Sequence, residues 1–185
     1  MQSIPIINSS WTLFLDRDGV INKEKKDGYI QQWSEFQFYD HALEAIATLS
    51  KHFGIIVIVT NQRGIGKKLM STQDLENIHH NMLRKIIEAN GRIDKIYYCP
   101  DIDNSSSNRK PNIGMALQAK KNFPKIQFDK SIIVGNTIND MRFGKNVGMY
   151  TVFITTTQPA ITLPNPFIDF QFDSLFSFAQ MLHNP

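Results

Sequence analysis

Short segments rich in β-branched and aromatic residues recur along the chain and predict strands. The clearest is the uninterrupted run Ile-Ile-Val-Ile-Val at residues 55–59. A strand without polar alternation has apolar side chains on both faces, which is typical of a parallel sheet covered by helices. The predicted strands are residues 11–15, 55–59, 93–98, 131–134 and 150–154, with a sixth, edge strand at 167–172.

The segments between these strands carry apolar residues at helical spacing, which predicts helices. Asp40 and Asp173 are candidate N-caps for the first and the last of them. Ser71 and Asp74 have the spacing of a capping box, and Asp140 is expected to open a short helix. The predicted helices span about residues 40–51, 72–90, 113–123, 140–147 and 173–182. Strands that alternate with helices predict one α/β domain over residues 1–185, built on a mostly parallel sheet.

Polar side chains follow four of the predicted strands, directly after three of them and, for Arg109 and Lys110, after a polar loop. In a parallel sheet the strand ends meet at one edge, where ligands bind. Residues 60–66 form a polar loop with two glycines, of the kind whose N–H groups and hydroxyl bind an anion. The side chains expected at the common edge are Asp16 and Asp18, Thr60 and Asn61, Arg109 and Lys110, and Asn136 and Asp140.

Three other segments have less specific patterns. The loop at residues 22–28 contains several lysines, and a solvated surface is favoured over a contact with substrate. Residues 29–39 are rich in aromatic side chains and predict an irregular flap, either a cover for the core or a lid over substrate. His79 and His80 are adjacent on a predicted helix and point in different directions, so they are interpreted as structural rather than as a metal-binding pair.

Composition narrows the function. The net charge is +3 and no long run of Lys or Arg occurs, so no nucleic-acid partner is expected, and a local positive field for an anionic substrate is favoured. The single cysteine excludes an internal disulfide or a multi-cysteine zinc site. Neither a membrane-spanning stretch nor a secretion signal is evident, so the cytoplasm and a monomer or small homo-oligomer are expected.

The residues at the common edge fit phosphoryl transfer. Asp16 is the candidate nucleophile, and Asp18 the candidate group for protonating the leaving oxygen and then activating water. A magnesium ion would offset the repulsion between Asp16 and phosphate. Thr60, Asn61 and Lys110 would hold the phosphate oxygens. The structural alternative is a polar turn after a strand, with Asp18 in the turn.

Four segments resemble the motifs of the haloacid dehalogenase (HAD) superfamily of phosphatases, over roughly residues 11–157. They are Asp16-Arg17-Asp18-Gly19, Thr60-Asn61-Gln62, Arg109-Lys110-Pro111 and Val134-Gly135-Asn136 through to Asp140. The sequences at residues 16–22, 28–29, 60–65 and 97–100 are most similar to the branch of heptose-1,7-bisphosphate phosphatases and histidinol-phosphatases. The resemblance implies a Rossmann-like sheet with little or no cap domain, magnesium dependence, and Asp16, Asp18, Asn136 and Asp140 as the metal-site residues.

The chain departs from that branch in two ways. Members often have a zinc-binding loop with a histidine and three cysteines, but here only Cys99 is present, so no structural zinc is expected and Cys99 is interpreted as a buried, inert thiol. Members usually have an aspartate where this chain has Asn136. An amide oxygen is a weaker ligand for a hard cation than a carboxylate, so weaker magnesium binding is expected, with Asp140 acting through water or holding the loop.

Three functions are therefore carried forward. The leading one is a magnesium-dependent phosphatase for a small phosphorylated metabolite, preferably a heptose-type sugar phosphate or bisphosphate, with Arg63 and the loop at residues 22–28 near a second phosphate. The second is a histidinol-phosphatase, which requires an acidic group near the mouth of the site. The third is a phospho-ligand-binding protein whose catalysis is weakened by Asn136.

Overall fold

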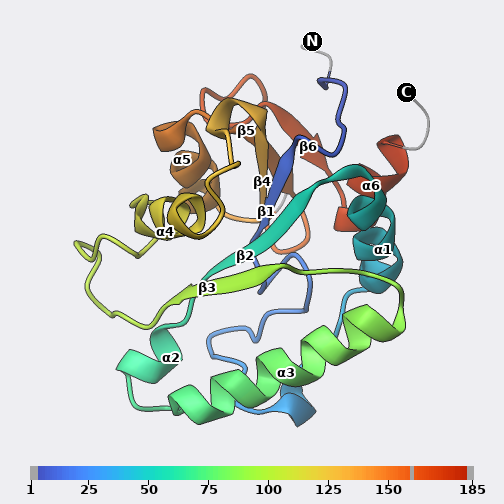
Figure 1. Cartoon of the computed structure of the whole chain (residues 1–185). Coiled ribbons are helices and arrows are strands. Elements are labelled where there is room, and N and C mark those ends of the chain that lie inside the picture. Colours follow the sequence, from blue (N-terminus) through green and yellow to red (C-terminus); the bar gives the residue numbers. More distant parts are fainter. Residues whose placement is uncertain (1–3, 159–160, 183–185) are drawn as a thin grey trace.

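The computed structural model describes residues 4–158 and 161–182 of the 185-residue chain. Its centre is a sheet in which all neighbouring strands are parallel, in the order β3-β2-β1-β4-β5-β6 (Figure 1). The predicted α/β fold is thereby confirmed. The strands are β1 (Thr12–Leu15), β2 (Ile55–Asn61), β3 (Lys95–Cys99), β4 (Ser131–Gly135), β5 (Tyr150–Ile154) and β6 (Phe170–Phe172).

Helices cover both faces of the sheet, as its uninterrupted apolar strands predict (Figure 1). Within β1, Leu13 and Leu15 are buried on one face and Phe14 on the other. The leucine face packs against α1 (Ala42–His52), α3 (Thr72–Glu88) and α6 (Leu175–Met181). The Phe14 face packs against α4 (Gly114–Asn122) and α5 (Ile138–Val147).

The position of β1 determines where a site can form. β1 lies between β2 and β4, and Phe14 pairs with Val57 on one side and Ile133 on the other. The chain adds β2 and β3 on one side of β1 and then crosses to add β4, β5 and β6 on the other. Beyond the carboxyl ends of strands at such a reversal lies the crevice in which open α/β sheets bind ligands.

Two predicted N-caps, those of α1 and α6, were misplaced by one residue. α1 and α6 have His41 and Ser174 as N-caps instead of Asp40 and Asp173, and the Ser174 hydroxyl accepts a hydrogen bond from the N–H of Ser177. The capping box of Ser71 at the start of α3 is confirmed. Within residues 4–158 and 161–182, no helix is both long and apolar enough to cross a bilayer.

Other element boundaries also differ from the prediction. The polar segment after β2 is not a simple loop, because Arg63–Gly66 forms the short helix α2. β3 begins at Lys95, and the edge strand β6 is confined to three residues. A 3-10 helix, η2 (Phe128–Lys130), precedes β4. These differences lie at the ends of elements, where the periodicity of the sequence is weakest.

The aromatic segment at residues 29–39 has two halves with different roles. Its later half contains the 3-10 helix η1 (Trp33–Glu35), and the rings of Trp33 and Phe38 each pack against that of Phe36, with centroids 5.0 Å apart. These rings pack on the core of the leucine face, so this half covers the core. Its first half, at Tyr29, lines a cavity beside the carboxyl ends of the strands.

Candidate active site

Asp16 is the first residue after β1, and the backbone directs its carboxylate into the protein. Its N–H donates to the carbonyl of Val134 on β4, 2.9 Å away. Its Oδ1 accepts hydrogen bonds from the N–H of Arg17 (2.8 Å) and lies 2.9 Å from Nζ of Lys110. Burial raises the pKa of Asp16 to about 7, although Lys110 acts in the opposite direction. The carboxylate is thus buried beside the ammonium of Lys110.

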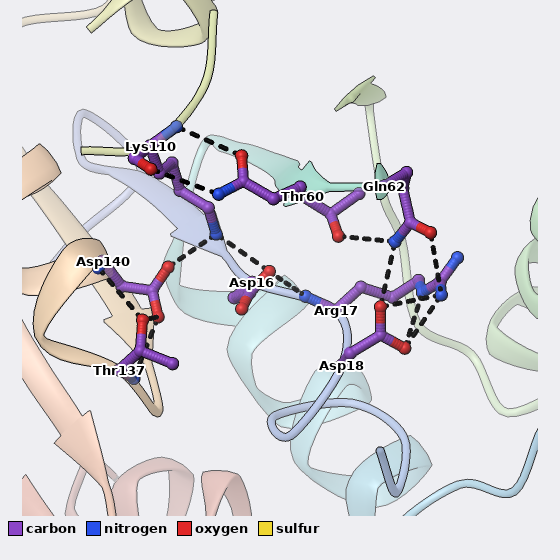
Figure 2. A network of polar contacts seen from close by, with 9 residues as sticks. Asp16, Arg17, Asp18, Thr60, Gln62, Lys110, Thr137 and Asp140 are labelled. Carbon is purple, nitrogen blue, oxygen red and sulfur yellow. Dashed lines mark hydrogen bonds and ion pairs between the residues drawn. The ribbon is translucent and has the colours of Figure 1, made fainter. Parts of the chain in front are cut away.

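Lys110 is the cation at the centre of the site, and its ammonium bridges two carboxylates (Figure 2). It lies 2.9 Å from Asp16 and 2.6 Å from Asp140. Burial alone would lower the pKa of Lys110, but the two carboxylates outweigh it and raise the pKa. The side chain of Asn61 holds the Lys110 backbone through bonds to its N–H (3.1 Å) and its carbonyl (3.2 Å). Asn61 therefore uses its side-chain amide to position Lys110.

Asp140 has partners on both carboxylate oxygens. Oδ1 pairs with Lys110, and Oδ2 accepts from the hydroxyl (2.6 Å) and the N–H (3.0 Å) of Thr137. Thr137 is the N-cap of α5 and Asp140 is its third residue, so the expectation that Asp140 opens this helix was wrong. Of the two roles left open for Asp140, the geometry supports holding the loop.

Asp18 lies on the other side of Asp16 from Lys110, where it contacts the guanidinium of Arg17 (Figure 2). Both its oxygens are 2.8 Å from the fully buried guanidinium of Arg17. Gln62 and Asn22 also donate to it, each at 2.9 Å. Burial would raise the pKa of Asp18, but Arg17 and these donors outweigh burial and lower it. Gln62 also donates to the Thr60 hydroxyl (2.8 Å), and so connects two predicted site residues.

The buried side of the Arg17 guanidinium faces α3. Its NH1 is 3.2 Å from Nε2 of His79, which is buried, whereas the neighbouring His80 is exposed. Burial and, to a lesser extent, the charge of Arg17 together lower the pKa of His79 to about 3, so the imidazole is neutral near pH 7 and accepts from Arg17. The structural interpretation of these two histidines fits this arrangement.

Asn136 follows β4 and packs directly against the turn after β1. A Cβ atom on Gly19, which has a φ of +84°, would lie 2.0 Å from Nδ2 of Asn136, so only glycine fits there. Asn136 Nδ2 donates to the hydroxyl of Thr157 (2.7 Å) in the loop after β5. In the same loop, the hydroxyl of Thr156 donates to the carbonyl of Gly19. The loop after β5 thus binds both Gly19 and Asn136, the two residues that pack against each other.

The residues present fit a magnesium ion beside Asp16. Asn136 is almost fully buried, and its Oδ1 has no hydrogen-bond partner among the described residues. A buried amide oxygen is costly to leave unpaired unless a ligand completes it. The side-chain oxygens of Asp18 are fully engaged, whereas its carbonyl accepts no backbone hydrogen bond from a described residue. Carboxylate, carbonyl and amide oxygens are the donors that magnesium takes.

The metal site is poor in charged ligands. Within residues 4–158 and 161–182, no three or more His, Cys, Asp or Glu side chains are grouped so that they could hold a metal ion. A metal at this position therefore depends on the amide of Asn136 where a third carboxylate is usual. Cys99 is buried, and burial raises the pKa of its thiol, so the expected inert thiol is consistent with the structure.

Arg63 and Arg109 meet at Asn104. Both guanidiniums donate to the side-chain oxygen of Asn104, Arg109 from Nε at 3.3 Å. Burial lowers the pKa of Arg109, and the charge of Arg63 adds to this effect. Two cations that share one neutral acceptor are a favourable place for an anion.

A cavity of about 600 Å³ opens beside Asp18. Its wall combines Gln62 and Asn61 with the lysine-containing loop, and both Lys25 and Lys26 line it. Lys25 also forms an ion pair with Glu35 (2.7 Å). The loop at residues 22–28 is therefore part of the wall of the site as well as a solvated surface. Glu24 and Asp27 also line this cavity. They are acidic groups near the mouth of the site, which the sequence alone did not locate.

Four residues of the site were not identified from the sequence: Arg17, Asn22, Gln62 and His79. Arg17 had a usable signal, because a cation between two carboxylates at the end of a buried strand must be paired. Asn22 and Gln62 lie within the segments already singled out. His79 had no recognisable signal in the sequence, because its burial depends on how α3 packs against the sheet.

The comparisons with known proteins agree with this geometry. The model of the polynucleotide kinase 3 phosphatase family matches residues 12–165. A D-glycero-alpha-D-manno-heptose-1,7-bisphosphate 7-phosphatase of Mycobacterium bovis is 33% identical over 170 residues, which cover 91% of this chain and 90% of the relative. A D-glycero-beta-D-manno-heptose-1,7-bisphosphate 7-phosphatase of Neisseria meningitidis is 31% identical over 176 residues, covering 92% and 93%.

A solved structure is also similar over nearly its whole length. It is the D,D-heptose 1,7-bisphosphate phosphatase of B. bronchiseptica, complexed with magnesium and phosphate. The TM-score is 0.82 at 25% sequence identity, and the match covers 94% of this chain and 98% of that one. Both proteins thus have the same fold over almost every residue.

Proposed function

This chain belongs to the polynucleotide kinase 3 phosphatase family of the HAD superfamily, and we propose that it removes one phosphate from a sugar phosphate of the heptose-1,7-bisphosphate type. The chain is a magnesium-dependent phosphatase. The observation that carries the substrate class is the match to heptose-bisphosphate phosphatases over nine-tenths of both chains. The cavity beside Asp18, with lysines in its wall, supports an anionic substrate of that size.

In the proposed reaction, a carboxylate oxygen of Asp16 attacks phosphorus, and the bond between phosphorus and the sugar oxygen breaks. Asp18 gives its proton to that oxygen, and the phosphoryl group remains on Asp16 as an acyl phosphate. Asp18 then takes a proton from water, whose oxygen attacks phosphorus and releases inorganic phosphate. Asp16 is thereby regenerated, and one water has been consumed per turnover.

The other residues of the site stabilise the negative charge that develops on the phosphate oxygens during the reaction. Lys110 lies 2.9 Å from Asp16 and is placed to offset the negative charge at that group during the reaction. The Thr60 hydroxyl is available to the phosphate oxygens, whereas the engagement of the Asn61 side chain with Lys110 leaves its backbone N–H for that role. Asp16, Asp18 and Asn136 would hold magnesium, which supplies positive charge between Asp16 and the incoming phosphate.

The ion pair between Arg17 and Asp18 favours one protonation state of Asp18. Since Arg17 lowers the pKa of Asp18, the ionised form is favoured while the pair is intact, and this form suits the activation of water. Protonating the leaving oxygen requires Asp18 to turn away from Arg17 and carry a proton. The same residue can therefore serve both half-reactions by changing partners.

A substrate panel tests the proposal. Heptose 1,7-bisphosphate, heptose 7-phosphate, other sugar phosphates and histidinol phosphate are compared by phosphate release, with magnesium titrated and Asn136→Asp assayed alongside. The highest kcat/KM is expected on a heptose bisphosphate, with one phosphate released. A preference for histidinol phosphate would reject the sugar substrate. No turnover by the wild type on any compound at any magnesium level, with activity in the variant, would identify a phospho-ligand-binding protein.

Charge reversal at Arg63 tests where a second phosphate binds. We propose that Arg63 and Arg109 bind the phosphate that is not cleaved, because they form the paired cations at Asn104. Arg63→Glu is expected to raise KM for the bisphosphate about tenfold or more and to change KM for the monophosphate much less. Lys121→Glu, which reverses an exposed charge on α4, is the control. An unchanged KM for the bisphosphate would place the second phosphate elsewhere.

A further inference from the structure

Gln62 lies between β2 and α2, and its side chain is buried in the site. It is the N-cap residue of α2, and its N–H donates to the carbonyl of Cys99 on β3, 2.7 Å away. Only 2% of the residue is exposed. A buried side-chain amide has two hydrogens and one accepting oxygen, and each of them needs a partner. The partners of these atoms indicate what the side chain does.

Each polar atom of the Gln62 amide has a partner in the site. Nε2 donates to Oδ2 of Asp18 at 2.9 Å and to the hydroxyl oxygen of Thr60 at 2.8 Å, which accounts for both of its hydrogens (Figure 2). Oε1 accepts from Nη2 of Arg17 at 3.4 Å. A guanidinium donates hydrogen bonds and never accepts them. Arg17 therefore fixes the amide with its oxygen toward the guanidinium and its nitrogen toward Thr60.

The bond from Gln62 determines how the hydroxyl of Thr60 can be used. A hydroxyl has a single hydrogen to donate, and its oxygen also accepts. Because Gln62 is the donor in this pair, the hydrogen of Thr60 is not used in it. Thr60 is 1% exposed, and its hydroxyl donates to none of the residues that the structure describes. A buried donor without an acceptor is costly unless a ligand supplies one, so this hydrogen is available to an anion.

We propose that Gln62 is a positioning residue of the phosphatase reaction: by donating to the hydroxyl of Thr60, it reserves the hydrogen of that hydroxyl for an oxygen of the phosphate. Ionised phosphate oxygens accept hydrogen bonds, so a hydroxyl that presented its lone pairs to them would repel them. The contact with Arg17 keeps the Gln62 amide oriented even when Asp18 turns away during the reaction. The proposal rests on the proposed function, in which Thr60 contacts phosphate.

The test measures the binding of inorganic phosphate to the full chain by calorimetry, with magnesium at a saturating concentration. Gln62→Glu and Thr60→Val are studied singly and together. An ionised glutamate beside Arg17 has the shape of glutamine but cannot donate, so it accepts the hydrogen of Thr60 and removes it from phosphate. Thr60→Val removes the hydroxyl at nearly constant volume. Gln73→Glu, which adds the same charge at an exposed position of α3, is the control.

Thr60→Val is expected to weaken phosphate binding about tenfold or more, as the loss of a hydrogen bond to a charged group does. Gln62→Glu should weaken it by at least as much. With Gln62→Glu present, the hydroxyl is already turned away, so adding Thr60→Val should change binding by less than about twofold. Gln62→Met removes the donors without adding a charge, so Thr60→Val should then have an intermediate effect. Gln73→Glu should change binding by less than about twofold, because its charge is exposed and screened.

Two results would overturn the proposal. An equal effect of Thr60→Val in the wild type and in both Gln62 variants would show that Gln62 acts through packing or charge and not through the hydroxyl. Phosphate binding that is absent in the wild type, or that Thr60→Val leaves unchanged, would show that the hydroxyl does not serve phosphate. If Gln62→Glu does not fold, the comparison with Gln62→Met decides alone. Because the probe is inorganic phosphate, each result is distinguishable from a failure of the proposed sugar substrate.

Discussion

Replacing Asp16 with asparagine is expected to abolish turnover while the fold is retained. Asparagine has the same shape and keeps an oxygen that accepts from the N–H of Arg17 and from Lys110. It is not a nucleophile toward phosphorus, so no acyl phosphate forms. Loss of a covalent nucleophile typically lowers kcat by at least about 10⁴-fold. The measurement is phosphate release on the best substrate of the panel, together with near-native thermal unfolding.

A rapid acid quench distinguishes the mechanism from a direct attack by water. During turnover the wild type should carry phosphate that hydroxylamine removes, as expected for an acyl phosphate, and Asp16→Asn should carry none. Asp129→Asn, which changes an exposed aspartate within η2, is the control and should behave as the wild type. If Asp16→Asn retained near-full activity, Asp16 would not be the nucleophile.

Replacing Lys110 with methionine is expected to cost both activity and stability. Methionine fills a similar volume but leaves Asp16 and Asp140 buried without their cation. Breaking a buried ion pair in this way typically costs about 3–5 kcal/mol. Activity should fall about 10²- to 10³-fold, because a preorganised donor to the phosphate is lost. Urea unfolding and kcat measure the two effects, with the exposed Lys130→Met as the control.

The stability deficit of Lys110→Met should shrink as the pH is lowered from 8 to 5.5. Burial already raises the pKa of Asp16 to about 7, and without Lys110 it rises further. The unfolded state has an aspartate pKa of about 3.9, so between these values the folded variant binds more protons than its unfolded form. Protonation therefore stabilises the folded variant as pH falls. A deficit that is equal at both pH values would mean that Asp16 is not left charged and buried.

The sequence predicted the elements of this fold because they depend on local pattern. The run at residues 55–59 is apolar on both faces, and the structure buries it between helices on both sides of the sheet. Asp16 and Lys110 were identified because they follow predicted strands, and parallel strands bring their ends together whatever the details of packing. Topology brings the ends of β1 and β3 to one edge, whereas the 2.9 Å contact depends on the loop that carries Lys110 back to Asp16.

The remaining parts of the site depend on contacts between distant segments. His79 contacts Arg17 across 62 residues, and nothing in the local sequence of α3 marks it as the neutral acceptor of a buried guanidinium. The orientation of the Asn136 amide depends on Thr157, 21 residues later. The misplaced N-caps have a different cause. Asp173 and Ser174 are both good capping residues, and only the course of the backbone decides between them.

The loop after β5 determines when the site can be completed during protein synthesis. Thr156 and Thr157 bind Gly19 and Asn136, which follow the neighbouring strands β1 and β4 and lie against each other although they are far apart in the sequence. The nucleophile is translated early, yet β1 obtains its second neighbouring strand only at residues 131–135. A growing chain that has passed Asp16 therefore carries an unfinished metal pocket until the ribosome has added residue 157. Premature termination before that point leaves the nucleophile without its finished metal pocket.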